Sequence, residues 1–140
     1  MAAERDIDEI TGEIVDAAYQ VHTRMGPGLL ESVYVVVMAR ALERRGLKVE
    51  RNKAVTFEFD GMRFERGLRV DLLVEDRVVV ELKSVEISAP VHAKQVLTYL
   101  RLLKLPVGLL INFGAATLKQ GVRRIVNNYE PAALATPETD

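Results

Sequence analysis

The sequence contains no cysteine and no long uninterrupted apolar run. Without cysteine the chain can form neither a disulfide framework nor a thiolate metal site, so a metal would need carboxylate, carbonyl or imidazole ligands, which disfavours zinc. The N-terminus has no basic start leading into an apolar segment, and no stretch of about 18 apolar residues follows later. We therefore expect a cytoplasmic protein that does not enter the membrane.

An excess of basic charge is also missing, because 19 Lys and Arg residues against 20 Asp and Glu residues give a net charge of −1. This balance counts against tight, non-specific binding of nucleic acid by the domain alone. The basic residues nevertheless gather in two groups, which are Arg40, Arg44, Arg45, Lys48, Arg51 and Lys53, and then Lys119, Arg123 and Arg124. Each group is explained either by a solvated helix face or by a patch that contacts phosphate.

The remaining composition is that of an ordinary globular protein, with 140 residues of which 49% are hydrophobic and 28% charged. A chain of this length is expected to form one core. We predict a single domain over residues 1–130. The small, polar segment 131–140 contains proline and is predicted to be a flexible tail.

The first part of the chain has helical periodicity. Apolar residues recur at three- and four-residue steps between residues 6 and 25, and Gly26-Pro27-Gly28 ends this predicted helix. A second helix is expected over residues 29–45, with Gly46 as a natural stop. The two helices are expected to form a hairpin.

From residue 49 the apolar period changes to two, which is typical of strands. Asp60-Gly61 predicts a hairpin turn between a first strand and a second one over residues 62–74, in which Gly67 would mark a bulge or bend. A further turn over residues 75–77 leads into a predicted central strand, residues 78–83. A three-residue turn here would place Asp71 directly opposite Glu81, whereas a two-residue turn would pair Asp71 with Val80.

The C-terminal part of the domain alternates helix and strand. We expect a helix over residues 90–104 with Ser88 as its N-cap, and then a buried strand over residues 107–113. Because a helix precedes that strand, it is expected to run parallel to its neighbour. A final helix is predicted over residues 117–128.

The chemistry of the sequence is concentrated on the predicted central strand. Side chains two residues apart on a strand share a face, so Glu81 and Lys83 point together on a strand that is otherwise apolar. Two carboxylates placed opposite each other, Asp71 and Glu81, repel unless a cation lies between them. All-oxygen ligands suit Mg²⁺ or Mn²⁺. The alternative is that Glu81 and Lys83 form a structural ion pair and that Asp71 only ends its strand.

Several motifs in a specific order resemble one family. Gly28-Leu29-Leu30-Glu31-Ser32-Val33-Tyr34 is similar to the pattern that names the GxxExxY family, a branch of the PD-(D/E)XK nuclease-like superfamily. The resemblance covers most of the chain, and the other motifs that carry it are Gly26-Pro27-Gly28, Asp60-Gly61, Arg69-Val70-Asp71-Leu72, Glu81-Leu82-Lys83, Gln95 with Tyr99, and Ile111-Asn112-Phe113-Gly114. In the proline-aspartate position of the superfamily this chain has Val70 before Asp71, which keeps the carboxylate.

The resemblance implies an α/β fold with a restriction-endonuclease-like α-β-β-β-α-β core, a mixed sheet flanked by helices. It implies catalytic roles for Glu31, Asp71, Glu81 and Lys83, and a metal held by Glu31, Asp71, Glu81 and Leu82. For Glu31 the alternative is that it only places charge in the first helical turn. The residues expected to contact substrate are Tyr34, Gln95 and Tyr99, the last two resembling a Gln-x-x-x-Tyr element of exonuclease-type relatives, although Tyr99 could equally be a packing residue.

Two functions follow as hypotheses. The first is a nuclease that uses Mg²⁺ or Mn²⁺ to hydrolyse phosphodiester bonds of DNA or RNA. The second is a catalytically inactive module of the same fold that serves as a regulatory or assembly partner, which the near-neutral charge favours. Because so compact a domain lacks an obvious segment that could enclose a substrate, a homodimer is also suspected.

Overall fold

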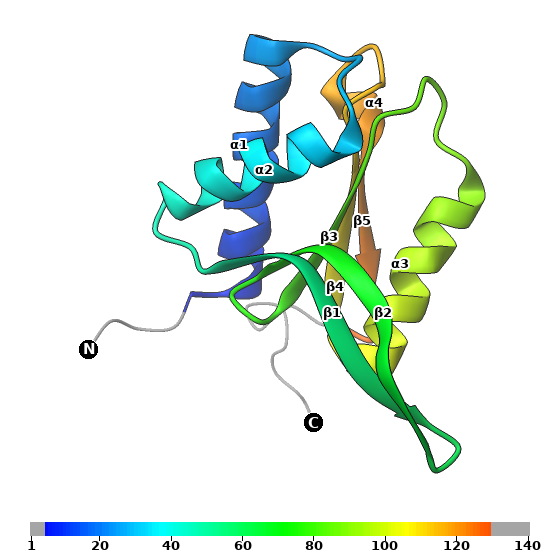
Figure 1. Cartoon of the computed structure of the whole chain (residues 1–140). Helices are drawn as coiled ribbons and strands as arrows, with labels where there is room; N and C mark the ends of the chain where they lie inside the picture. Colours follow the sequence, from blue (N-terminus) through cyan, green and yellow to red (C-terminus); the bar gives the residue numbers. More distant parts are fainter. Residues whose placement is uncertain (1–4, 130–140) are drawn as a thin grey trace, which may run out of the picture.

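A computed structural model describes residues 5–129, in which helices cover both faces of a five-stranded sheet (Figure 1). The helices are α1 (Ile7–Met25), α2 (Glu31–Glu43), α3 (Pro90–Leu103) and α4 (Leu118–Gly121). The strands are β1 (Val49–Phe59), β2 (Met62–Val74), β3 (Val78–Lys83), β4 (Val107–Asn112) and β5 (Val122–Val126). The run from α2 to β4 has the expected α-β-β-β-α-β order, and the restriction-endonuclease-like fold class is confirmed.

The sheet is mixed, with the strands in the order β1-β2-β3-β4-β5. β3 and β4 are parallel, with Val78 opposite Val107, and every other neighbouring pair is antiparallel. All six residues of β4 are buried, as expected for a strand with helices on both faces. The prediction of a parallel, buried strand after the α3 crossover is therefore confirmed.

The helical hairpin of α1 and α2 forms one outer layer, and α3 forms the other (Figure 1). The apolar stripe of α1, which includes Ile10, Ile14 and Ala18, is buried against α2 and the sheet. On the opposite face Val96 and Leu100 of α3 pack over β4. This close packing needs Gly108, because a Cβ there would lie 2.8 Å from Val96 Cγ1 and 3.1 Å from the carbonyl oxygen of Val79. The sheet thus separates two apolar cores.

The long hairpin of β1 and β2 extends beyond the other strands (Figure 1). Its register shifts where Val55 pairs with Leu68 while Phe57 pairs with Phe64, so β2 carries two extra residues at this place. Gly67 lies in this segment, and a Cβ on it would collide with the ring of Phe57. The predicted bulge at Gly67 is confirmed, and the ring of Phe57 packed against the backbone explains why this position needs glycine.

The prediction of a final helix over residues 117–128 is wrong beyond its first turn. Only the four residues of α4 are helical, and the next five form β5, which pairs with β4 along its free edge. Leu118, Val122 and Ile125 do have helical spacing, which explains the prediction. The segment is rich in β-branched residues, however, and pairing satisfies the backbone groups of β4 that a helix would leave unpaired.

Smaller differences concern the ends of elements and the chain termini. α3 begins after Ala89, which is its N-cap in place of the predicted Ser88. The Ser88 hydroxyl instead lies 3.4 Å from Nδ1 of His92. The predicted tail, residues 131–140, lies outside the described residues. Within residues 5–129 no helix is both long and apolar enough to cross a membrane.

Candidate active site

The candidate site lies where β2 and β3 stop pairing through their backbones. Val74 lies opposite Val78 and Leu72 opposite Val80, which confirms the predicted three-residue turn. At the next pair, Asp71 and Glu81, side-chain hydrogen bonds replace the backbone hydrogen bonds between the two strands. The amide of Asp71 donates to Oε2 of Glu81 over 2.8 Å.

The reciprocal bond is equally short, since the amide of Leu82 donates to Oδ2 of Asp71 over 2.8 Å. Each carboxylate therefore binds the main chain of the opposite strand. Charge-assisted bonds of this kind are stronger than neutral ones. They bring the two carboxylates of Asp71 and Glu81 together and fix one oxygen of each.

Both carboxylates stand in an environment that disfavours their charge. Glu81 is only 5% exposed. Burial is the main cause that raises the pKa of its carboxyl to about 7, and the charge of Asp71 is the second. Burial also raises the pKa of Asp71, while the hydrogen bond from Leu82 acts in the opposite direction. Perturbed carboxyls of this kind are concentrated at functional sites, although structural networks produce them too.

Lys83 is two residues beyond Glu81 and half-buried. Val80 and Leu82 pack under α1 and α2, whereas Val79 packs under α3, so the alternation of β3 directs Glu81 and Lys83 toward the α3 side. Burial raises the pKa of both carboxyls, and the charge of Lys83 acts against that rise. Among residues 5–129, Lys83 makes no ion pair within 4 Å, so the alternative of a structural Glu81–Lys83 pair is not formed.

Glu31 reaches the same region from the other side of the sheet. It is exposed in the first turn of α2, and its Oε2 accepts a bond from the amide of Ser84 over 3.3 Å. The Ser84 hydroxyl donates to the carbonyl of Leu29 over 2.5 Å, which ties the start of α2 to the end of β3. The charge of Glu31 adds to the burial that raises the pKa of Asp71 and Glu81.

The structure brings together only two of the four expected metal ligands through their side chains. No group of three or more Asp, Glu or His side chains within residues 5–129 is arranged to hold a metal ion. Asp71 and Glu81 come together, whereas Glu31 is bonded to Ser84. The side chain of Leu82 is fully buried in the core under α1 and α2, so Leu82 could offer only its main-chain carbonyl.

The donor set nevertheless fits a small divalent cation. Within the described residues, Oδ1 of Asp71 and Oε1 of Glu81 make no hydrogen bond, so each carboxylate keeps one oxygen free. Two like charges in a partly buried place repel, and a cation between them would reverse that sign. Oxygen ligands and a carboxylate pair are the ligands that Mg²⁺ and Mn²⁺ prefer.

Gln95 and Tyr99 bring α3 to this site. Nε2 of Gln95 donates to the Tyr99 hydroxyl over 3.0 Å, so the predicted shared face is formed. Tyr99 is half-buried, and burial raises its pKa, with the charges of Glu81 and Asp71 acting in the same direction. Tyr99 packs against the core under α3, which is the face of the sheet toward which β3 directs Glu81.

Tyr34 has a different place from the one expected. It is fully buried, its ring stacks on Phe113 with centroids 4.3 Å apart, and its hydroxyl donates to the carbonyl of Gly26 over 2.5 Å. The hydroxyl also receives a long bond of 3.4 Å from the amide of Leu29. A side chain enclosed in this way has no surface for substrate. We therefore correct the expected substrate contact to a role in holding the loop between α1 and α2.

Two residues that support the site were given no role by the sequence analysis. Asn112 is 2% exposed. Its Nδ2 donates to the carbonyl of Val85 over 2.9 Å, and its Oδ1 accepts from the Val85 amide over 3.0 Å. Gly114 packs against the same segment, where a Cβ would collide with the main chain of Val85. A polar residue at the end of an apolar strand, followed closely by glycine, was the available signal. Together they fix the chain just after Lys83.

A partly buried carboxylate pair, a nearby lysine and a mixed sheet with helices on both faces together define an α/β protein with an acidic candidate site. The sequence profile of the PD-(D/E)XK nuclease superfamily matches residues 8–125. That match spans 118 of the 140 residues, and the chain therefore belongs to this superfamily. Comparisons with curated proteins and with solved structures gave no significant match.

Proposed function

We propose that this protein is a nuclease that hydrolyses phosphodiester bonds of nucleic acid with Mg²⁺ or Mn²⁺. The observation that carries the proposal is the reciprocal bonding of Asp71 and Glu81, which leaves one free oxygen on each of two adjacent carboxylates. Membership of the PD-(D/E)XK nuclease superfamily supports it.

In this proposal Asp71 and Glu81 hold the metal, joined by Glu31 from α2 and by the main-chain carbonyl of Leu82. The bound ion would supply Lewis-acid stabilisation of the charge that develops on the phosphate. Lys83 orients the attacking water and, in its neutral form, takes the proton that this water loses, which suits its position two residues beyond Glu81. As the oxygen of the water bonds to phosphorus, one P–O ester bond breaks, and the leaving oxygen takes up a proton from the solvent.

Gln95 and Tyr99 are proposed to contact the substrate strand. Their mutual hydrogen bond leaves the carbonyl of Gln95 available to accept and the Tyr99 hydroxyl available to donate. Burial, and then the charge of Glu81, raises the pKa of Tyr99, so its hydroxyl stays protonated and able to donate even above its usual range. A phosphate or sugar oxygen beside the carboxylates is a suitable acceptor.

Metal binding is tested first, by thermal unfolding with and without Mn²⁺. A ligand bound only by the folded state raises the unfolding midpoint, and at 100 times its dissociation constant it adds about 2.7 kcal/mol. Asp71→Asn keeps an acceptor for the Leu82 amide but loses the charge, so the shift should disappear in this variant. A shift of unchanged size in Asp71→Asn would place the metal elsewhere.

Cleavage is tested on single- and double-stranded DNA and RNA with Mg²⁺ or Mn²⁺. Removing a group that transfers a proton commonly costs about 10² to 10⁴ in rate, so Lys83→Ala should lose activity by that order. Lys48→Ala is the matched control, because Lys48 pairs with Asp76 beside the turn at the opposite end of β3, and both side chains are mostly exposed. Activity that survives Lys83→Ala, or no cleavage of any substrate, contradicts the proposal.

One observation favours the second function, an inactive nuclease-fold module with a regulatory or assembly role. Within residues 5–129 three ligating side chains are not gathered in one place, and Glu31 is engaged by Ser84. An inactive module predicts that Mn²⁺ leaves the unfolding midpoint unchanged. The thermal experiment therefore separates the two functions before any substrate is found.

We also propose that the chain belongs to the GxxExxY branch of the superfamily. The three residues that name the motif have connected roles, which supports this assignment. Gly28 adopts φ 103°, a conformation that favours glycine, and Glu31 and Tyr34 bind Ser84 and Gly26. A homodimer stays a prediction, and sedimentation analysis at several concentrations would test it.

A further inference from the structure

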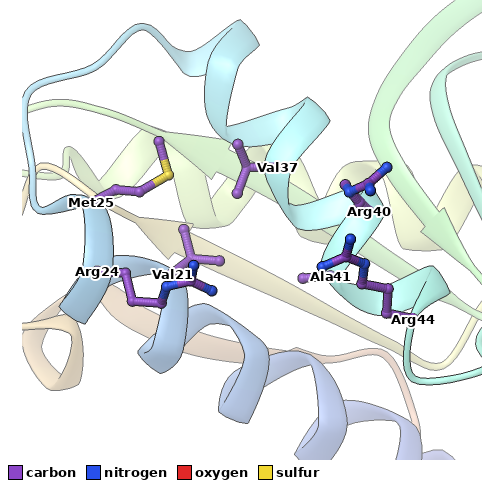
Figure 2. Close-up of a pocket in the computed structure, with 7 residues that line it drawn as sticks. All are labelled: Val21, Arg24, Met25, Val37, Arg40, Ala41 and Arg44. Carbon is purple, nitrogen blue, oxygen red and sulfur yellow. The ribbon is translucent and has the colours of Figure 1, made fainter.

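A groove of about 340 Å³ lies between the ends of α1 and α2 and has no part in the proposed hydrolysis (Figure 2). Arg24 enters it from α1, and Arg40 and Arg44 enter it from the C-terminal end of α2 (Figure 2). Apolar side chains, including Val21 and Val37, line the rest. One guanidinium group thus lines the groove on the α1 side and two line it on the α2 side, with apolar side chains between them.

Several basic residues close to Arg40 and Arg44 in the sequence are held by carboxylates. Arg45 pairs with Glu13 at 2.8 Å, and Lys53 pairs with Glu50 at 2.7 Å. Within residues 5–129, no carboxylate lies within 4 Å of any of the three groove arginines. Like charges that line one groove without a counter-charge repel each other, and an anion in the groove would reverse that sign.

Attraction to helix C-termini accounts for single arginines at such positions, but not for three arginines that line one groove. Arg101 provides the comparison, because it also lies in the last turn of a helix, α3, and is exposed. It lines no part of the groove. The feature that needs explanation is therefore the shared cavity, and not the helix position.

The groove is separate from the candidate active site. Arg40 follows Glu31 by nine residues on α2, and at 3.6 residues per turn this separation places them about 180° apart around the helix. Arg40 therefore faces away from the side of α2 that approaches Ser84. A ligand in the groove would not touch Asp71 or Glu81.

The chemistry of the lining identifies a class of ligand. Arginine binds phosphate through two parallel hydrogen bonds and stacks its plane on flat rings, and the apolar floor suits a ring rather than a fully hydrated ion. A volume of 340 Å³ is at the lower end of the roughly 300–1,000 Å³ of small-molecule sites. We propose that this groove binds a phosphate-bearing small ligand of the nucleoside monophosphate class.

The test is calorimetric titration of the whole protein with adenosine monophosphate in EDTA, so that the metal site does not contribute. Saturable binding is expected, and adenosine without phosphate should not bind. Losing one charged hydrogen-bond partner should weaken binding of the nucleotide by at least about tenfold in Arg40→Gln. Arg101→Gln is the matched control and should bind as the unaltered protein does.

Arg24→Gln, on the other helix, gives a second variant in case Arg40→Gln does not fold, and it should weaken binding similarly. Absence of binding at millimolar nucleotide, or equal binding by both groove variants and the control, overturns the proposal. Inorganic phosphate binding as tightly as the nucleotide would overturn the part assigned to the apolar floor. None of these results depends on nuclease activity, so the two proposals fail separately.

Discussion

Replacing Glu81 by glutamine tests the electrostatics of the site without removing its shape. Glutamine is nearly isosteric with glutamate, and its carbonyl oxygen still accepts the bond that the Asp71 amide donates to Oε2 of Glu81 over 2.8 Å. The substitution removes only the charge that burial and Asp71 disfavour. Its effect on stability should therefore depend on pH in a direction set by the raised pKa.

The sign follows from proton binding by the folded and unfolded states. Below pH 4.5, the ordinary pKa, Glu81 is largely protonated in both states and the substitution should change little. Between 4.5 and about 7 the unfolded chain ionises first, so the folded state holds more protons and loses stability as pH rises. Above pH 7 the penalty is complete, and a pKa difference of this size corresponds to about 3 kcal/mol.

Urea denaturation in EDTA, at several pH values between 4.5 and 8, measures this difference. The free energy of unfolding of Glu81→Gln should exceed that of the unaltered protein by up to about 3 kcal/mol at pH 8, and by almost nothing at pH 4.5. The control Glu86→Gln alters an exposed carboxyl just after β3 and should leave the pH profile unchanged. A stability difference that is the same at both pH values would refute the reasoning.

Two further predictions concern the segments that hold the site. Gly114→Ala should lower the free energy of unfolding by about 1–3 kcal/mol because its Cβ collides with the main chain of Val85, whereas Gly12→Ala, a helical position with open space, should raise it by about 0.5–1 kcal/mol. Equal effects in urea denaturation would show that the collision is relieved without cost. Tyr34→Phe removes the 2.5 Å bond to the part-buried carbonyl of Gly26 and should cost about 0.5–1.5 kcal/mol, and an unchanged urea midpoint would contradict this.

Much of the fold could be predicted because its local signals agree with the packing. The apolar stripe of α1, the Asp60-Gly61 turn and the bulge at Gly67 each follow from short-range chemistry, and the structure has them at those positions. β5 could not be predicted in this way. Val122 and Ile125 have a spacing compatible with a helix, and only the free edge of β4, a feature of the assembled sheet, selects a strand.

The site was predictable in its members more than in its geometry. Strand alternation and turn length placed Asp71, Glu81 and Lys83 near each other, because both depend on local backbone spacing. Sequence gave no sign that the carboxylates would bond to opposite main-chain amides, since that depends on the strands diverging. Tyr34 was misplaced for a related reason, because its partner Phe113 is distant in the chain.

The divided use of the two carboxylates determines how this site must be tested. One oxygen of Asp71 and one of Glu81 join β2 to β3, while the second oxygen of each is free within the described residues. An alanine at either position would remove the strand contact together with the proposed metal ligand, so loss of activity would not distinguish the two roles. Asparagine and glutamine keep the acceptor and remove the charge. If these amide variants fold like the unaltered protein and yet no longer respond to Mn²⁺, the carboxylates act in metal binding as well as in joining the strands.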